Sequence, residues 1–275
     1  MPELPEVETV RRGLLNLVKG NVIEKVTVLY PKMIENDPKE FCELLKGRKI
    51  EDVDRRGKYL LFRFSGSLTM VSHLRMEGKY FVKQASQPLE KHTHVVFDLN
   101  DGRQLRYNDM RKFGRMRLVK TGDENQLSGI AKLGPEPLSD DFTAENLYSR
   151  LKKKRKEIKP ALLDQTLVTG LGNIYVDEVL WMSKIHPETP ANHLSKDEAR
   201  LLHDSIVKEL KTAIKAGGTT IRSYTDAFQH TGSFQFDLNV YGKEGEPCPR
   251  CQTKIVKIKV GQRGTHFCPH CQKVE

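Results

Sequence analysis

The chain has 275 residues and carries 46 lysines and arginines against 36 acidic residues, a net charge of +10. A chain of this length buries a substantial core and more often forms two domains than one. The excess of positive charge suits a polyanionic partner such as nucleic acid. No apolar run of about 18 residues is present and the start, PELPEVE, is acidic, so neither a membrane span nor a signal peptide is expected. We therefore expect a cytoplasmic protein without a membrane partner.

The first half of the chain predicts one helix followed by strands. From Leu4 to Leu17 apolar residues recur at helical spacing, and Gly20 is a stop signal. Seven short β-type segments follow, separated by turn residues: VIEKVTVLY, YLLFRF, LTMVSHL, KYFVK, THVVFDL, QLRYN and GRMRLV. Closely spaced strands of this kind predict a β-sandwich or barrel. We assign residues 1–133 to this domain.

The second half of the chain is expected to be mainly helical. After Leu133 the stretch GPEPLSDD indicates a linker, and helical patterns cover 143–156, 160–168, 173–183 and 195–216. We assign residues 134–216 to a second domain. From Gly217 a loop of roughly twenty residues begins, long enough that a function or disorder is more expected than a plain connection. The sequence thus predicts an α+β, multidomain fold, with residues 217–238 as this loop.

The last part of the chain carries a metal-site pattern. Two Cys-x-x-Cys pairs lie sixteen residues apart and provide four thiolates, Cys248, Cys251, Cys268 and Cys271. This spacing is typical of a tetrahedral structural zinc site, and redox pairing is less favoured because no βαβ pattern surrounds it. Between the pairs, apolar residues and the turn GQRG predict a β-hairpin with Arg263 at its tip. His266 and His270 are alternative ligands, although surface or supporting positions are favoured. We assign residues 239–273 to this zinc finger.

Segments along nearly the whole chain resemble one enzyme family. They are MPELPEVETVRRGL, RRGKYLLF, SHLRMEGKY, EKHTHVVF, NDMRKFG, LGPEPLSDDF, IKPALLDQTLVTGLGNIYVDEVLW, IHP, GGTTIR, VYGKEGEPC and RGTHFCPHC. In this order they resemble the formamidopyrimidine-DNA glycosylases. The resemblance implies an N-terminal β-sandwich catalytic domain with a leading helix, a helix-two-turn-helix domain and a β-hairpin zinc finger. It also implies a glycosylase and lyase of base excision repair that removes 8-oxoguanine and formamidopyrimidines from damaged double-stranded DNA.

The resemblance implies four catalytic residues. Pro2 would be the nucleophile through its terminal amine, Glu3 the neighbouring acid, Lys58 the residue of β-elimination and Arg263 that of δ-elimination. An α-amine has a pKa of about 7.7 to 8, against about 10.4 for lysine, so far more of it is unprotonated at neutral pH. Met1 must first be removed, because its peptide bond makes the Pro2 nitrogen an amide. Glu6 would have an orienting role.

Further residues are implied in holding DNA. Met76, Arg111 and Phe113 match an intercalating triad that fills the gap left by an extruded nucleotide, while His92, Lys154, Lys159 and Asn173 match positions of DNA contact. The run 150–159 holds seven basic residues and one acid. The glycines of TGLGN resemble the turn of a helix-two-turn-helix motif, and a dinucleotide fold is disfavoured because no strand precedes them.

Some functions and contacts stay open from sequence alone. Arg222 and Tyr224 lie in the loop that resembles the segment covering the extruded purine, and we assign no base contact to either. The alternatives to an oxidised-purine glycosylase are an endonuclease VIII-like enzyme for oxidised pyrimidines and a non-catalytic, zinc-dependent DNA-binding protein. We expect a monomer that works in the cytoplasm at the nucleoid.

Overall fold

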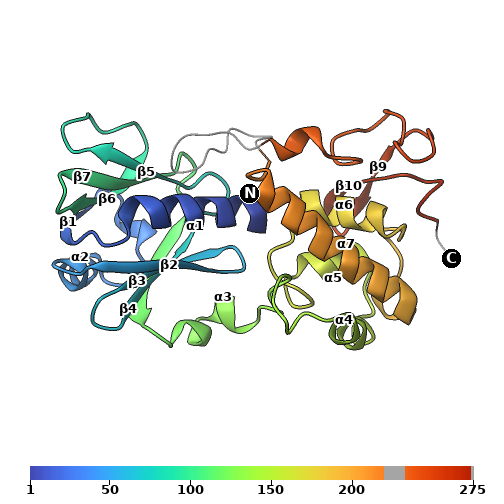
Figure 1. Cartoon of the computed structure of the whole chain (residues 1–275), viewed down its shortest axis with the longest axis horizontal. Coiled ribbons are helices and arrows are strands. Elements are labelled where there is room, and N and C mark those ends of the chain that lie inside the picture. Colours follow the sequence, from blue (N-terminus) through green and yellow to red (C-terminus); the bar gives the residue numbers. More distant parts are fainter. Residues whose placement is uncertain (220–232, 274–275) are drawn as a thin grey trace. The chain divides into compact units, whose positions relative to one another are not determined.

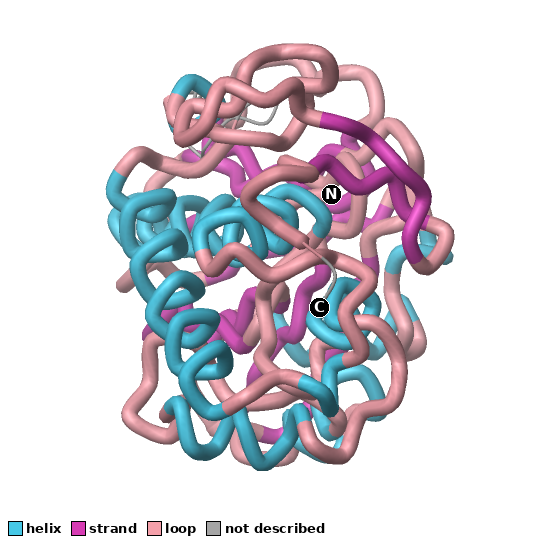
Figure 2. The backbone as a smooth tube through the Cα atoms, turned by 90° about the vertical axis from the view of Figure 1, so that its right-hand side faces the viewer, coloured by secondary structure: helices cyan, strands magenta, loops and turns pink. Residues whose placement is uncertain are grey.

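The computed structural model describes residues 1–219 and 233–273. The chain divides into two compact units (Figure 1). Unit 1 comprises Met1–Ala131 and Gly217–Ser233, and unit 2 comprises Lys132–Ala216 and Phe234–Glu275. Long loops connect the helices and strands, as Figure 2 shows in pink. No helix in the described part of the chain is long and apolar enough to span a membrane.

Unit 1 contains two antiparallel, four-stranded sheets. Their strands are β1 (Ile23–Val28), β2 (Ile50–Arg56), β3 (Tyr59–Phe64), β4 (Leu68–His73), β5 (Lys79–Gln84), β6 (Thr93–Leu99), β7 (Arg103–Asn108) and β8 (Arg115–Lys120). One sheet has the order β1-β6-β7-β5 and the other β2-β3-β4-β8. Buried residues of both sheets, such as Phe62 and Phe97, belong to one hydrophobic core. The predicted β-sandwich is confirmed.

Helix α1 (Leu4–Val18) leads into this sandwich as predicted. Its buried residues Leu4, Val7, Val10 and Leu14 follow the spacing of one helix face. The helix contacts β2 of one sheet and β5 of the other. The first turn of α1 is therefore held against the rigid part of unit 1.

Two elements of unit 1 escaped the sequence prediction. Strand β2 has only Ile50 and Val53 as apolar residues, and a register shift between Ile50 and Asp52 breaks the alternation that reveals a strand. Helix α2 (Pro38–Leu45) is short, and it begins because the Asp37 side chain accepts hydrogen bonds from two backbone N–H groups. A short helix α3 (Ser128–Ala131) and the 3-10 turns Pro31–Met33 and Glu124–Gln126 complete the unit.

Unit 2 is helical apart from one hairpin. It contains α4 (Ala144–Leu151), α5 (Ile158–Leu163), α6 (Asn173–Met182), α7 (Lys196–Lys215), the 3-10 turns Ala191–His193 and Phe234–Phe236, and the strands β9 (Val256–Val260) and β10 (Arg263–Phe267). Helices α4 and α5 are shorter than predicted. Helix α4 ends at Leu151, and the basic residues that follow form a turn. Helix α5 begins at Ile158, two residues before Pro160, because proline is tolerated in the first turn of a helix. The predicted α+β fold is confirmed.

Candidate catalytic and DNA-binding site

The start of the chain is fixed by its own first helical turn. Pro2 and Glu3 are buried, and the Glu3 backbone N–H donates to Glu6 Oε2 at 2.8 Å within a capping box. Glu6 Oε1 accepts from the backbone N–H of Thr219 at 2.8 Å, which ties Thr219 to α1. The orienting role expected of Glu6 is consistent with these contacts. Arg222 and Tyr224 lie outside the described residues.

Charged groups surround the amino terminus. Desolvation by burial lowers the pKa of the Met1 amine, and the charge of Lys58 lowers it further, while the carboxylates of Glu3, Glu6 and Glu77 act in the opposite direction. Lys58 lies in the turn between β2 and β3, directly before the strand YLLFRF, and it is buried. The arrangement brings an amine, a carboxyl group and a second amine into one electrostatic environment, which suits nucleophilic and acid–base chemistry.

An ion cluster around the buried Glu8 of α1 had no signal in the sequence. Glu8 Oε1 accepts from Arg11 at 2.9 Å and from Arg12 at 2.8 Å, and Glu8 Oε2 lies 3.2 Å from Arg55 Nε of β2. Desolvation raises the pKa of Glu8, but the arginine hydrogen bonds and charges outweigh it and bring the pKa to about 2. The cluster fixes α1 on β2 next to the turn that carries Lys58.

The residues of the expected intercalating triad lie on two turns of unit 1. Met76 is half-buried between β4 and β5, whereas Arg111 and Phe113 are exposed between β7 and β8. The Arg111 guanidinium lies over the Phe113 ring, 4.6 Å from its centroid. A phenylalanine side chain is usually buried in a core, so an exposed one that stacks with an arginine is unusual. Such a pair suits a surface that contacts nucleic-acid bases.

Buried Asp109 shapes the turn that carries Arg111 and Phe113. Its Oδ1 accepts from the Arg111 N–H at 3.0 Å and its Oδ2 from the Gly114 N–H at 2.7 Å. The Asp109 N–H also donates to the carbonyl oxygen of His92, whose φ of 70° places it in the left-handed region. One carboxylate thus supports the turn near three of the expected DNA-binding residues, and sequence reasoning missed it.

In unit 2 the TGLGN segment forms the turn between α5 and α6. The Gln165 side chain spans this turn: its Oε1 accepts from the Gly170 N–H at 2.8 Å and its Nε2 donates to the Leu171 carbonyl at 2.6 Å. Gly172 is the N-cap of α6, which begins at Asn173 directly after this turn. A helix precedes the turn, which agrees with rejecting the dinucleotide fold.

The four cysteines near the end of the chain come together. Their Sγ atoms all lie within 4.8 Å of one another, as four ligands of one ion require. Trp181 Nε1 donates to Cys248 Sγ at 3.4 Å, and Trp181, Val240 and Ile255 pack around the cysteines. His270 is exposed and His266 is not in the cluster, so the thiolate set Cys248, Cys251, Cys268 and Cys271 fits a structural zinc ion.

The hairpin places Arg263 at its tip, as predicted. Arg263 is exposed and pairs with Val260 across a two-residue turn in which Gly261 and Gln262 both have positive φ, 52° and 64°. The next residue, Gly264, offers its carbonyl oxygen to Asn173 Nδ2 at 3.0 Å and to Lys159 Nζ at 3.0 Å. The tip is therefore attached to the first residue of α6 and to α5.

Lys159 differs from the expectation of a DNA contact. Its side chain is fully buried, and its Nζ lies 2.6 Å from Asp177 Oδ1, which is also fully buried. Asp177 Oδ2 accepts from the His266 N–H at 2.9 Å. A lysine enclosed in this way has no access to a phosphate, because burial and pairing keep its ammonium inside unit 2. No sequence pattern pointed to Asp177.

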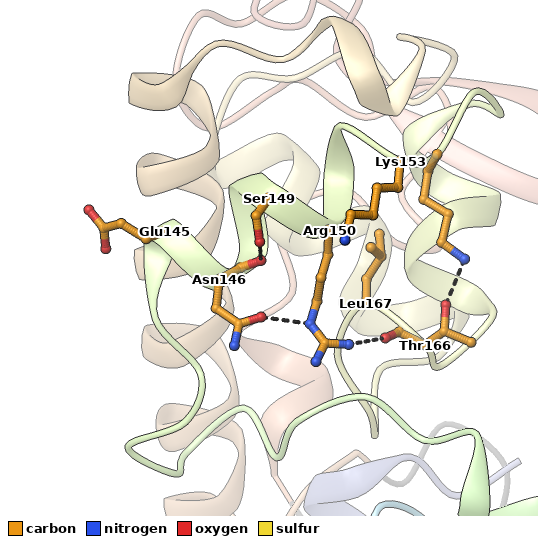
Figure 3. Close-up of a pocket in the computed structure, with 8 residues that line it drawn as sticks. Glu145, Asn146, Ser149, Arg150, Lys153, Thr166 and Leu167 are labelled. Carbon is orange, nitrogen blue, oxygen red and sulfur yellow. Dashed lines mark hydrogen bonds between the residues drawn. The ribbon is translucent and has the colours of Figure 1, made fainter.

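Lys154 lies on the surface of unit 2. Its Nζ donates to Thr166 Oγ1 at 2.8 Å and lies 3.3 Å from Asp164 Oδ2. It lines a hollow of about 860 Å³ together with Arg150 and Lys153, and Figure 3 shows Arg150 reaching between Asn146 and Thr166. This basic hollow is open to an anionic partner.

Comparisons with known proteins agree with this architecture. Three family models match in order: the formamidopyrimidine-DNA glycosylase N-terminal domain over residues 1–116, the H2TH domain of that enzyme over 133–225, and the zinc finger found in FPG and IleRS over 245–274. The formamidopyrimidine-DNA glycosylase of Ligilactobacillus salivarius is 64% identical over 100% of both chains. That of Latilactobacillus sakei is 57% identical over 99% of this chain and 98% of the relative.

Solved structures give the same result. A mutant of the Lactococcus lactis FPG, in complex with a Fapy-dG containing DNA, has a TM-score of 0.94 and 48% identity, covering 99% of this chain and 100% of the other. The Lactococcus lactis Fpg in complex with an abasic site containing DNA has a TM-score of 0.93 and 47% identity at the same coverage. The zinc finger family matches the segment that contains the four clustered cysteines. One structural zinc ion is therefore assigned to Cys248, Cys251, Cys268 and Cys271. The chain belongs to the formamidopyrimidine-DNA glycosylase family, the DNA glycosylases of base excision repair.

Proposed function

We propose that this enzyme excises 8-oxoguanine and formamidopyrimidines through a Schiff base on Pro2 and then cleaves the strand by β,δ-elimination. The observation that carries the proposal is the environment of the amino terminus, where burial lowers the pKa of the Met1 amine and the charges of Glu3 and Lys58 act on it, directly beside the buried Pro2. Once Met1 is removed, the Pro2 nitrogen is a secondary amine at this buried position. A lowered pKa keeps more of such an amine unprotonated and nucleophilic at neutral pH.

The chemistry then follows from the residues present. The Pro2 nitrogen attacks C1′ of the deoxyribose, the glycosidic bond breaks, and Glu3 supplies the proton for the sugar oxygen or the departing base. The C1′–O4′ bond of the sugar then opens and leaves an iminium cation between the Pro2 nitrogen and C1′. This cation accepts the electron pair of the C2′–H bond when that proton leaves, and the resulting enamine expels the 3′-phosphate, which takes the electrons of the C3′–O bond. Lys58 is assigned to this β-elimination, and Arg263 to the following δ-elimination, which breaks the C5′–O bond.

DNA recognition is assigned to the two exposed turns of unit 1 and to the hairpin turn and α6 of unit 2. Extruding the damaged nucleotide costs a few kcal/mol, and insertion of Met76 and Phe113 into the gap offsets part of that cost. Arg111 would contact the base left unpaired. The Lactococcus lactis relatives were solved with Fapy-dG and abasic DNA, which supports damaged double-stranded DNA as the partner. His92, Lys154 and Asn173 are proposed to contact phosphates.

The zinc ion has a structural role in this proposal. Four thiolates leave no open ligand position for water, so zinc holds the fold of the hairpin and takes no part in the reaction. The Lys159–Asp177 pair attaches the same hairpin to α5 and α6. Lys159 is thus proposed to position Arg263 through the Gly264 carbonyl instead of contacting DNA. We further propose that the enzyme acts as a monomer on the chromosome in the cytoplasm.

Borohydride trapping tests the proposed chemistry. A duplex with one 8-oxoguanine opposite cytosine is incubated with the processed enzyme and sodium borohydride, next to an undamaged duplex of the same sequence. A covalent protein–DNA adduct is expected only with the damaged duplex, because only the Schiff base is reducible. Base release without any adduct would contradict the proposal.

A further inference from the structure

A second pocket lies in unit 1, on the outer face of the sheet β2-β3-β4-β8. It has a volume of about 150 Å³ and is closed on one side by residues 127–130 of α3 and the turn before it. This pocket is here called the arginine pocket, and its polar lining residues are Glu35, Tyr59, His73, Arg75, Arg115, Arg117 and Ser128. None of these residues belongs to the catalytic set described above.

The strand register explains why the basic residues meet. Tyr59 pairs with His73 and His73 with Arg115, so these three side chains lie in one row across β3, β4 and β8. Arg117 stands two residues further along β8 and therefore on the same face as Arg115. Arg75 lies two residues after the end of β4, at the end of this row. The strand register therefore fixes Tyr59, His73, Arg115 and Arg117 on one face of the sheet.

The arginines of this pocket form no ion pair within the described part of the chain. On the same sheet face, Arg63 is paired with both Asp54 and Glu124. In contrast, among the described residues no carboxylate contacts the guanidinium of Arg75 or Arg117. Arg115 donates only to the carbonyl oxygens of residues 112 and 114.

The net charge of the lining is positive. Three arginines and one acidic residue, Glu35, line the pocket, which gives 3 − 1 = +2. His73 adds no charge at neutral pH, because desolvation and then the charges of Arg75 and Lys58 lower its pKa to about 3. A pocket with this positive charge favours binding of an anion of high charge density.

We propose that the arginine pocket binds a phosphate group. Its volume of about 150 Å³ has room for the five heavy atoms of a phosphate and is far too small for a base pair. Guanidinium groups match the geometry of phosphate oxygens with paired N–H donors. The binding chemistry is therefore that of a tetrahedral oxyanion.

The position of the pocket favours a DNA phosphate as the source. The turn with Met76 begins where β4 ends, and the turn with Phe113 ends where β8 begins, so both turns leave the sheet at the end that carries the pocket. This assignment rests on the proposed function, in which these turns enter the duplex. A backbone phosphate beside the intercalated step is then the group within reach, and the contact would widen the footprint of the enzyme beyond the lesion.

Salt-dependent binding tests the DNA source. Arg117→Ala and the control Lys120→Ala, which removes a charge from the far end of β8, are titrated onto a duplex with a non-cleavable abasic analogue between 50 and 300 mM KCl. Loss of one phosphate contact lowers the slope of log Kd against log salt by ~0.9. We expect this loss for Arg117→Ala and an unchanged slope for Lys120→Ala.

Inorganic phosphate tests the pocket without DNA. The melting temperature of the wild type should rise with phosphate at constant ionic strength, because a ligand that binds only the folded state stabilises it, and Arg117→Glu should abolish the rise. A phosphate effect without a change in the salt slope assigns the pocket to free phosphate. No phosphate effect together with no slope change overturns the proposal. If the wild type also forms no borohydride adduct, the proposed function fails, while the phosphate titration still decides the pocket.

Discussion

Breaking the buried pair Lys159–Asp177 should destabilise unit 2 strongly. The two charges lie 2.6 Å apart and both side chains are fully buried. Lys159→Met removes one charge and leaves the Asp177 carboxylate buried with the His266 backbone N–H as a remaining donor. An uncompensated buried charge of this kind costs about 3–5 kcal/mol in the free energy of unfolding. In the double variant Lys159→Met/Asp177→Asn no charge is buried, and most of this loss should be recovered.

The single tryptophan of the chain provides the assay. Trp181 packs against Cys248 in unit 2, so its fluorescence during urea unfolding reports on the part of the molecule that the pair stabilises. Lys156→Met is the matched control, because Lys156 is exposed and its pair with Asp164 is worth at most about 1 kcal/mol. The reasoning is refuted if Lys159→Met and Lys156→Met unfold alike, or if the double variant is as unstable as the sum of its single variants.

Four other perturbations test the remaining sites. Pro2→Gly, which keeps a terminal amine but only a primary one, should still bind damaged DNA and turn over much more slowly in single-turnover assays. Cys248→Ser should lose the one zinc ion per chain, measured by elemental analysis, and abolish DNA binding while circular dichroism of the β-rich unit persists. Arg111→Ala should erase much of an expected preference for excision opposite cytosine over adenine, worth ~1–3 kcal/mol, since a guanidinium has only donors and cytosine offers two adjacent acceptors; equal wild-type rates opposite both bases would refute it. Burial, and after it the charges of Glu178 and Asp237, raise the pKa of Glu209 to about 8. The folded state therefore keeps a proton that the unfolded state loses near pH 4.5, so the free energy of unfolding should fall as the pH rises from 4.5 to 8. Urea titrations across this range should show a smaller fall for Glu209→Gln.

Patterns that repeat along the chain predicted the fold well. The apolar stripe from Leu4 predicted α1, and two Cys-x-x-Cys pairs predicted the zinc cluster, because helix geometry and metal coordination impose fixed spacings. Strand β2 was missed since its register shift destroys the two-residue period that reveals a strand. Helix α2 was missed because eight residues contain little more than two turns.

The candidate site could be predicted only in part. The family motifs named candidate site residues, and these assignments stay predictions. The motifs did not point to the carboxylates that support them: Asp109, which accepts from the Arg111 N–H, and Asp177, which accepts from the His266 N–H in the hairpin. A carboxylate such as Asp177 meets its partner only in the folded chain, and no fixed spacing in the sequence links the two. Lys159 shows the opposite error, because in a run of exposed basic residues nothing distinguishes the one lysine that turns inward to a carboxylate.

The identity of the nucleophile is the central claim, and mapping the trapped adduct tests it most directly. The borohydride-reduced complex is digested with a protease and a nuclease, and the peptide that carries the sugar remnant is sequenced by mass spectrometry. The adduct is expected on the nitrogen of Pro2 in chains that lack Met1, and chains that retain Met1 should form none. An adduct on Lys58, or on any residue of a chain that still begins with Met1, would contradict the account.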